Sequence, residues 1–526
     1  MRKQASREFD ARKLDAIFAH LDRCHLPGAA VGVALGGAPV YRKGFGLANM
    51  ELPVVLGPAT MMRIGSMTKH FAALAFLLLC EEGSAHIDDQ IGQHVPEIHE
   101  TSRHVTMRRL MSHTSGIRDV YQISMFTHGM GRTITDAELL ECYRRIEDVD
   151  FAPGESWSYN NGGYLLVTAA IERITGQSLD EVLARRIFAP LGMYDTRLRR
   201  WDSDFQPNSA ALHMVDGKGN YTRRTMDMEL TGAGGIVSTM DDMLRWLRHM
   251  DAPVIGTAGT WNLMRQTQRL ANGAHTAYGL GLVVDRYRGV DTVSHAGGVM
   301  GGNSQMIKVP SAQLDISIAC NRADAMAADF AYRIIDLCVD GLEPCCACGN
   351  PLARGTYLSS PSGRVIEVHS RDGSAFVSVD AGMPMPVVPG GDEVWRLAPA
   401  FSFVGQTFVP TKGGLRFAEF GREEQCRKIE PPAEAAFCPP EGVYRAAAID
   451  VDAQVFPESG HARLRMQGRY GEVEYELTPL TERIWKARSR DPLLPLAGIL
   501  AFAADGGEFV LTADRMRQIR FRRARR

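Results

Sequence analysis

The sequence SMTKHFAALAFLLLC, residues 66–80, joins a polar tetrapeptide to the longest apolar run of the chain. Its pattern predicts a helix from Ser66 to Glu82, entered from a loop. Residues three apart lie on one face of a helix, so Lys69 can contact the Ser66 hydroxyl. The unpaired backbone N–H groups at a helix start also favour a negative charge that develops beside Ser66. The segment therefore predicts an activated serine nucleophile.

Lysine is rare in this chain, with nine residues among the 59 basic ones. A lysine has a pKa of about 10.4, and it acts as a base near neutral pH only where burial or a neighbouring positive charge lowers that pKa. By itself the Ser-x-x-Lys pattern is a weak signal, because roughly half a chance match is expected at this composition. Its weight depends on two further segments.

The second segment is Tyr159-Asn160-Asn161, in a loop directly before a helix predicted over Gly163 to Thr175. A tyrosine hydroxyl near the Ser66/Lys69 pair can relay a proton to a leaving amine. The Asn161 amide can hold the lysine or a substrate carbonyl. Taken alone, Tyr159 is more typical of a half-buried packing residue.

The third segment is His295-Ala296-Gly297-Gly298, after a strand predicted over Val290 to Val293. Glycine after a strand allows a substrate backbone to approach closely, and the N–H of Gly298 is a candidate second oxyanion donor. His295 is assigned an orienting or electrostatic role. A plain glycine-rich turn is the alternative for this segment alone.

The first 345 residues alternate helical and strand patterns, which predicts an α+β region with an antiparallel sheet. Ala29 to Ala48 reads as two strands joined at Gly36-Gly37. Further helices are predicted over Ser178 to Arg186, Met240 to Met250 and Ala325 to Cys338.

Beyond Cys348 the chain changes to short alternating runs, with a hairpin predicted over Val365 to Val379. Gly355-Thr356-Tyr357 and Gly442-Val443-Tyr444 each open a strand-rich segment. The interval of 87 residues (442 minus 355) is enough for a small barrel. Four prolines between the segments form a natural linker. Two β-domains are therefore expected.

The charge balance, 59 Lys and Arg against 61 Asp and Glu, provides no global field that would recruit nucleic acid or an acidic membrane. Seven of the last twelve residues are arginine, from Arg515 to Arg526, but apolar residues alternate with them as in a solvated terminal strand. The ten-residue apolar run is about half the length of a membrane span. The N-terminus lacks the apolar core of a secretory signal, so a cytoplasmic protein is expected.

Ten cysteines are too few for a disulfide scaffold. Three of them, Cys345, Cys346 and Cys348, cluster without the second ligand pair that a zinc site needs. His94 and His99 are five apart with a proline between them, unlike the pair of a metalloprotease helix. Neither a metal nor a cofactor is expected.

In combination, the order Ser-x-x-Lys, Tyr-x-Asn, His-x-Gly resembles the penicillin-recognising serine hydrolases, the superfamily of class C β-lactamases, DD-peptidases and related esterases. The resemblance covers about residues 26 to 335. Supporting matches are residues 106–117, 151–164, 187–193 and 234–239. It implies a serine β-lactamase/DD-peptidase-like domain, with an antiparallel sheet flanked by helices.

The remaining residues look like the paired antiparallel β-barrels of bacterial D-aminopeptidases, which release an N-terminal D-residue from peptides and amides. The resemblance implies a catalytic domain over residues 1–345, barrels over 346–432 and 433–526, and a homodimer. Ala296 stands where that family tends to have glycine.

In that family a loop of the last barrel supplies an acid for the free amine of the substrate. The best match here lies between a strand predicted to end at Trp485 and a strand over Ile499 to Phe502, and Asp491 is its only acid. Arg488 and Arg490 flank this acid and can neutralise it or bind a substrate carboxylate. A purely structural turn residue is an equal alternative, because Asp-Pro often opens turns.

The resemblance thus implies a serine acyl-enzyme that hydrolyses N-terminal D-residues, with Ser66, Lys69, Tyr159 and His295 as catalytic residues. Asn161, Gly297, Gly298 and Asp491 are the expected substrate contacts. One alternative is an esterase or β-lactamase of the same fold. An alternative of another class is a sensor that binds penicillin or peptide without turnover.

Overall fold

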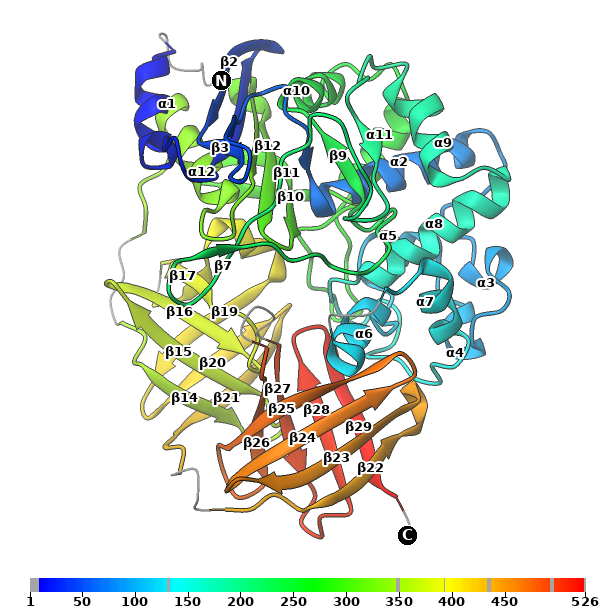
Figure 1. The fold of residues 1–526 in the computed structure, drawn as a ribbon, viewed down its shortest axis with the longest axis vertical. Coiled ribbons are helices and arrows are strands. Elements are labelled where there is room, and N and C mark those ends of the chain that lie inside the picture. The colour runs from blue at the N-terminus through cyan, green and yellow to red at the C-terminus, as the bar shows by residue number, and fades with distance from the viewer. Residues whose placement is uncertain are drawn as a thin grey trace.

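The computed structural model describes residues 9–129, 133–346, 351–391, 393–432, 437–491 and 496–524. They form a helix-flanked sheet followed by two closed β-barrels (Figure 1). The α+β class and the change to strands in the last third of the chain are confirmed.

The central sheet is antiparallel, with the strand order β10-β11-β12-β13-β1-β2. Its strands are β1 (Ala29–Leu35), β2 (Ala38–Phe45), β10 (Val283–Tyr287), β11 (Val290–Val299), β12 (Gly302–Val309) and β13 (Leu314–Cys320). The hairpin predicted at Gly36-Gly37 is confirmed, because β1 and β2 meet at these two residues, both with positive φ. The first and last parts of the catalytic region therefore pair side by side.

Helices cover both faces of this sheet. On one face α1 (Ala11–Phe18) and α12 (Ala327–Cys338) share an apolar core with β1 and β13. On the other face α10 (Met240–His249) packs against β1 and β13. Removing these apolar side chains from water is the main stabilising contribution.

A second, mainly helical part surrounds α2 (Thr68–Glu81), which is buried along most of its length. Its other helices are α3 (Ile91–His94), α4 (Glu100–Arg103), α5 (Met107–Met111), α6 (Val120–His128), α7 (Asp136–Tyr143), α8 (Asn161–Thr175), α9 (Leu179–Leu183) and α11 (Ala258–Arg265). The helix predicted over Ser178 to Arg186 is present, but it changes from an α-helix to a π-helix, because α9 continues as a π-helix over Ala184–Phe188.

The first barrel closes between its first and last strands. Its strands are β14 (Gly355–Ser359), β15 (Val365–Arg371), β16 (Ser374–Val379), β17 (Met385–Pro389), β18 (Trp395–Leu397), β19 (Gln406–Thr411), β20 (Gly414–Glu419) and β21 (Arg422–Ile429). The hairpin predicted over Val365 to Val379 is confirmed as β15 and β16.

The second barrel repeats this topology. Its strands are β22 (Gly442–Ala446), β23 (Val451–Glu458), β24 (His461–Gly468), β25 (Gly471–Pro479), β26 (Ile484–Ser489), β27 (Ala497–Phe502), β28 (Glu508–Ala513) and β29 (Met516–Arg523). β29 is the terminal strand that the alternation among the last arginines predicts.

The predicted repeat extends to individual bonds. Gly355 and Gly442 open the two barrels at φ values of 153° and 155°, which side chains rarely adopt. Two residues later, the Tyr357 hydroxyl donates to the carbonyl of Ala353 at 2.7 Å, and the Tyr444 hydroxyl donates to that of Pro440 at 2.9 Å. The two barrels are therefore built from the same local pattern.

A buried ion network joins the barrels to the catalytic region. The Arg517 guanidinium of the second barrel donates to Glu419 of the first barrel at 2.9 Å, and Arg364 donates to the same carboxylate at 3.1 Å. The Arg517 backbone N–H donates to Asp150 at 2.9 Å, and its carbonyl accepts from Arg118 at 2.5 Å. This network fixes the start of β29 against the catalytic region.

We expect Glu419→Gln to lower the free energy of unfolding by about 3 kcal/mol at pH 7, because two arginines lose a buried carboxylate. Burial alone would raise the Glu419 pKa, but Arg517 and Arg364 lower it to about 2. Because the folded-state pKa is depressed, this contribution is full above pH of about 4.5 and disappears as the pH falls toward 2. Urea unfolding of wild type and variant at pH 7 and pH 3 measures both effects.

Glu423→Gln is the matched control, because that glutamate is 57% exposed in its ion pair with Arg416. Its effect should lie within about 1 kcal/mol. A Glu419→Gln variant as stable as the wild type at pH 7 would contradict the structural importance of the network.

Candidate active site

Ser66 lies in a single 3-10 turn, Gly65–Met67, directly before α2. The helix thus begins two residues later than predicted. The reason is Gly65, whose φ of 53° turns the chain against β11 before the helix can start. The Lys69 ammonium nitrogen donates to Ser66 Oγ at 3.1 Å, so the predicted contact within the motif is present.

Lys69 has no exposed surface. Its Nζ also donates to Asn161 Oδ1 at 2.8 Å and to the Ala233 carbonyl at 2.5 Å. Burial, followed by the positive charge of Arg515, lowers the pKa of Lys69 well below its ordinary value, although Asp119 opposes the shift. A neutral amine beside a serine hydroxyl is able to act as a general base.

Tyr159 and Asn161 converge on this pair from the start of α8. The Tyr159 hydroxyl lies near enough to Ser66 for the serine to lower the tyrosine pKa slightly, whereas burial, the larger effect, raises it. The Tyr159 ring centroid lies 4.8 Å from Lys69 Nζ. The three side chains that a proton relay would use therefore lie together at the start of α2.

Buried polar groups hold the beginning of α8. Asp119 accepts the backbone N–H groups of Asn161 and Gly162, both at 3.1 Å. Asn160 caps the helix by accepting from the N–H of Gly163 at 2.9 Å. These bonds fix the Asn161 amide that accepts from Lys69.

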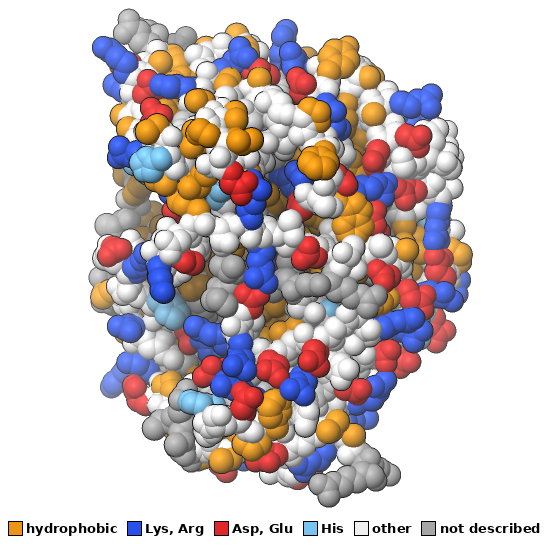
Figure 2. All heavy atoms as spheres, in the orientation of Figure 1, with side chains coloured by type: hydrophobic (Ala, Val, Ile, Leu, Met, Phe, Trp, Pro, Cys, Tyr) orange, Lys and Arg blue, Asp and Glu red, His pale blue; other side chains and the backbone are white. Residues whose placement is uncertain are grey.

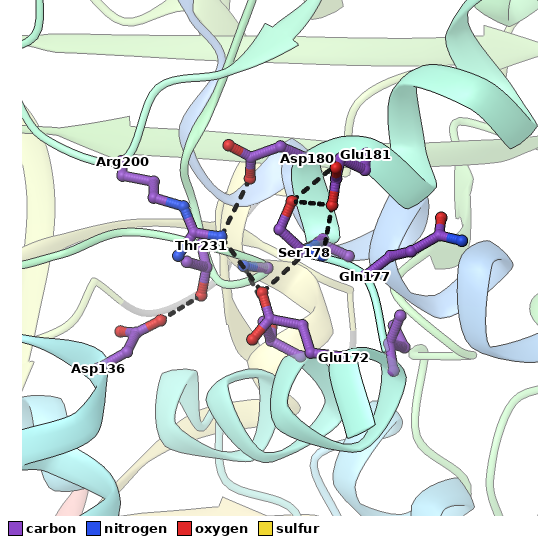
Figure 3. A network of polar contacts seen from close by, with 12 residues as sticks. Asp136, Glu172, Gln177, Ser178, Asp180, Glu181, Arg200 and Thr231 are labelled. Carbon is purple, nitrogen blue, oxygen red and sulfur yellow. Dashed lines mark hydrogen bonds and ion pairs between the residues drawn. The ribbon is translucent and has the colours of Figure 1, made fainter. Parts of the chain in front are cut away.

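A second network holds the segment that contains Ala233 (Figure 3). Arg200 donates to Glu172 and Asp180, each at 3.2 Å, and Thr231 donates to Asp136 at 2.6 Å. Thr231 lies two residues before the carbonyl that accepts from Lys69. The network therefore holds the Ala233 carbonyl in place, and this carbonyl in turn helps to position Lys69.

Gly297 and Gly298 lie within β11, because its pairing with β12 continues to Val299 and Gly302. The strand therefore extends past the end predicted at Val293. A Cβ at Gly297 would lie 1.9 Å from the Ile64 carbonyl, and one at Gly65 would lie 2.9 Å from the N of Gly298. Glycine is thus required for the close approach of this strand to the Ser66 turn.

Gly298 is exposed, and a Cβ built there meets open space. Its backbone and the turn that carries Ser66 lie side by side. Two backbone N–H groups at such a position are able to stabilise an oxyanion that develops on a substrate bound to Ser66.

His295 is a buried residue of β11, behind these groups. Its Nε2 is 2.8 Å from the Tyr278 hydroxyl, and its Nδ1 is 2.6 Å from the Ala296 carbonyl. Burial, and then Lys69, lowers the pKa of His295 to about 3, so the imidazole is neutral at physiological pH. Its ring centroid lies 6.5 Å from that of Tyr159, which fits an orienting role.

Asp491 forms an ion pair that sequence reasoning did not identify. Arg224, from the segment that leads to Thr231 and Ala233, donates to both carboxylate oxygens. Arg490 instead pairs with Glu458 and Glu474. The preceding strand β26 continues to Ser489 rather than ending at Trp485, and residues 492–495 of the predicted loop lie outside the described residues.

Arg515 is the site residue that sequence reasoning missed. It lies in the turn between β28 and β29, and its guanidinium carbon is 4.7 Å from the centroid of the Tyr159 ring. The residue was expected in a solvated strand end. No signal in the sequence marks it, because the sequence does not reveal which end of a barrel faces the β-lactamase-like region.

Other sequence expectations concern the surface. On the face shown in Figure 2, basic and acidic side chains are interspersed. Within the described ranges, no group of three or more His, Cys, Asp or Glu side chains is placed to hold a metal ion. Cys345 and Cys346 are exposed, and Cys348 lies outside the described residues. None of the helices described is long and apolar enough to cross a membrane.

Comparisons with known proteins match this architecture. The chain is 27% identical to a D-aminopeptidase of Gluconobacter oxydans over 515 residues, which cover 95% of this chain and 96% of that protein. It is 25% identical to a D-aminopeptidase of Brucella anthropi over 497 residues, covering 91% of each. These alignments extend through both barrels.

Solved structures share the fold. The octameric penicillin-binding protein homologue from Pyrococcus abyssi superposes with a TM-score of 0.59 at 22% identity, covering 80% of this chain and all of that one. A D-amino acid amidase from Ochrobactrum anthropi SV3, complexed with L-phenylalanine, gives a TM-score of 0.52 at 22% identity, covering 62% and 98%.

The Beta-lactamase family model matches residues 14–338, which is more than half of the chain and includes the segments that contain Ser66, Tyr159 and His295. Together with the contact between Ser66 and Lys69 at the start of α2, this match establishes that the chain belongs to the Beta-lactamase family.

Proposed function

We propose that this protein is a D-stereospecific aminopeptidase, which hydrolyses N-terminal D-residues from peptides and amides through a serine acyl-enzyme. The observation that carries the proposal is the contact of Ser66 with buried Lys69 in a chain that aligns with D-aminopeptidases through both barrels. The substrate is a small peptide or amide.

In the acylation step, Ser66 Oγ attacks the carbonyl carbon of the N-terminal D-residue, and its proton passes to neutral Lys69. The N–H groups of Ser66 and Gly298 bind the oxyanion. Tyr159 delivers a proton to the leaving amine as the C–N bond breaks and takes one from protonated Lys69, so that both groups return to their starting states. The products of this step are a free amine and an ester between the D-residue and Ser66.

In the deacylation step, water attacks the ester carbonyl and loses a proton to the same base. The C–O bond to Ser66 breaks, the serine oxygen recovers a proton, and the free D-amino acid leaves. Asn161 and Ala233 hold Lys69 during both steps, while Gly297 and neutral His295 keep the β11 backbone in position for the substrate.

Four substrates separate this function from its alternatives: D-alanine p-nitroanilide, its L-enantiomer, a short p-nitrophenyl ester and a chromogenic cephalosporin. We expect hydrolysis of the first and a strong preference over the second. A response to the ester or the cephalosporin alone would favour an esterase or β-lactamase. Stable labelling by penicillin without any turnover would favour a sensor.

Asp491 is our proposed contact for the substrate ammonium, in competition with its ion pair to Arg224. We expect Asp491→Asn to raise KM for D-alanine p-nitroanilide about tenfold, with a smaller change for an ester that lacks the amine. Arg224→Gln should have the opposite effect on KM, because it removes the competing cation. Equal changes for both substrates would assign Asp491 a structural role.

The assembly proposed for the chain is a homodimer, following its resemblance to the D-aminopeptidases.

A further inference from the structure

The turn between β28 and β29 reaches Tyr159, beside the candidate nucleophile Ser66. Figure 1 shows this hairpin extending from the second barrel toward the catalytic region. Arg515 lies at its tip, with its guanidinium carbon 4.7 Å from the centroid of the Tyr159 ring, and Tyr159 lies near enough to Ser66 for the serine to influence its pKa. A guanidinium from the second barrel therefore lies against the ring of Tyr159.

The hairpin is held firmly at its base. Two residues after Arg515, the backbone of Arg517 bonds to Asp150 and Arg118, and its side chain bonds to Glu419. The corresponding last hairpin of the first barrel also reaches this region, because Phe420 packs on Trp157 with ring centroids 5.6 Å apart. Both barrels thus contribute their final turns to the loop that carries Tyr159.

Arg515 provides the permanent positive charge of the site. Lys69 and His295 have pKa values lowered by burial, whereas an arginine stays protonated in proteins. The Arg515 side chain is 30% exposed. A guanidinium of a partly exposed side chain beside Tyr159 is suited to bidentate binding of a carboxylate.

The carboxylates near Arg515 leave it available to a ligand. Asp514, its closest acidic neighbour among the described residues, is 3.5 Å away and 55% exposed, so the pair is weak and open to water. Asp119 is buried and accepts backbone N–H groups of α8.

We propose that Arg515 is a specificity-determining residue that binds a carboxylate of the substrate. This inference rests on the proposed function and narrows its substrate class to D-aminoacyl compounds with a second, acidic group. The carboxylate is either the acidic side chain of the N-terminal D-residue or the free carboxyl terminus of the leaving residue.

Two matched substrate pairs distinguish these sources. The first compares the α-p-nitroanilides of D-glutamate and D-glutamine, which differ only in the side-chain carboxylate. The second compares D-alanyl-glycine with D-alanyl-glycinamide, which differ in the terminal carboxylate. We expect wild type to prefer the acidic member of one pair by about ten- to a hundredfold in kcat/KM. This is the preference that a charge-assisted hydrogen bond to the substrate carboxylate provides. Arg515→Gln should abolish this ratio, and Arg515→Lys should retain part of it.

Arg520→Gln is the control, because that arginine lies on β29, the strand that follows Arg515, is 54% exposed and pairs with Glu508. It should keep the wild-type ratio. The inference is overturned if wild type hydrolyses these substrates without preferring an acidic member, or if Arg515→Gln slows both members of a pair equally. Inactivity of wild type toward all four substrates would instead reject the proposed function, and this inference with it.

Discussion

Replacing Ser66 by alanine is expected to lower kcat for D-alanine p-nitroanilide at least about 10⁴-fold, because the nucleophile that forms the acyl-enzyme is lost. Substrate binding should change little, because the barrels, the β11 backbone and Arg515 remain. Steady-state kinetics measures the loss, and intact-protein mass spectrometry after brief mixing with substrate should detect an acyl adduct on wild type only.

Ser84→Ala provides the control for this substitution. Ser84 is exposed just beyond the other end of α2, and its replacement should leave kcat and the acyl adduct unchanged. A Ser66→Ala variant that keeps full amidase activity would exclude Ser66 as the nucleophile and the acyl-enzyme mechanism with it.

Local sequence patterns predicted the elements on which this mechanism depends. The Ser66/Lys69 contact follows from residue spacing on a helix. The strand-rich repeat follows from Gly355 and Gly442, which have the same backbone conformation and are followed by tyrosines that make the same bond. In these cases a few neighbouring residues determine the structure.

Contacts between distant segments were not predictable in this way. Arg515 reaches Tyr159 only because of the orientation of the second barrel, which depends on buried pairs such as Arg517 with Glu419. The ion pair between Arg224 and Asp491 joins residues 267 positions apart, so the arginines adjacent to Asp491 in the sequence were poor guides to its partner.

The start of α2 illustrates the limit of periodicity. The pattern predicts helix from Ser66, but Gly65 and Gly297 allow the chain to approach β11, and the helix begins at Thr68. Periodicity reports which residues share a face, whereas this boundary depends on a backbone contact with a strand more than 200 residues later.

Lys69→Met is expected to lower kcat/KM about 10⁴-fold, because Ser66 loses the base that accepts its proton. Ser66 and Lys69 act as a unit, so the loss of one removes most of the contribution of both. Methionine preserves the apolar stem in this buried position, so the loss should reflect proton transfer rather than unfolding. Circular dichroism and the urea midpoint check the fold. An active Lys69→Met variant would transfer the base role to Tyr159.

The pH dependence of wild type provides the sharper test of Lys69. Only the neutral amine accepts the Ser66 proton, so kcat/KM should rise as the pH increases through the lysine pKa. Burial, followed by Arg515, lowers this pKa, which places the acid limb of the profile well below the ordinary lysine value.

Arg515→Gln removes the nearby positive charge, raises the Lys69 pKa and should move the acid limb to higher pH. The limb should move in this direction with uncharged D-aminoacyl side chains, since the shift does not depend on a substrate carboxylate. An unchanged acid limb in Arg515→Gln would mean that Lys69 is not the group whose ionisation controls the rate.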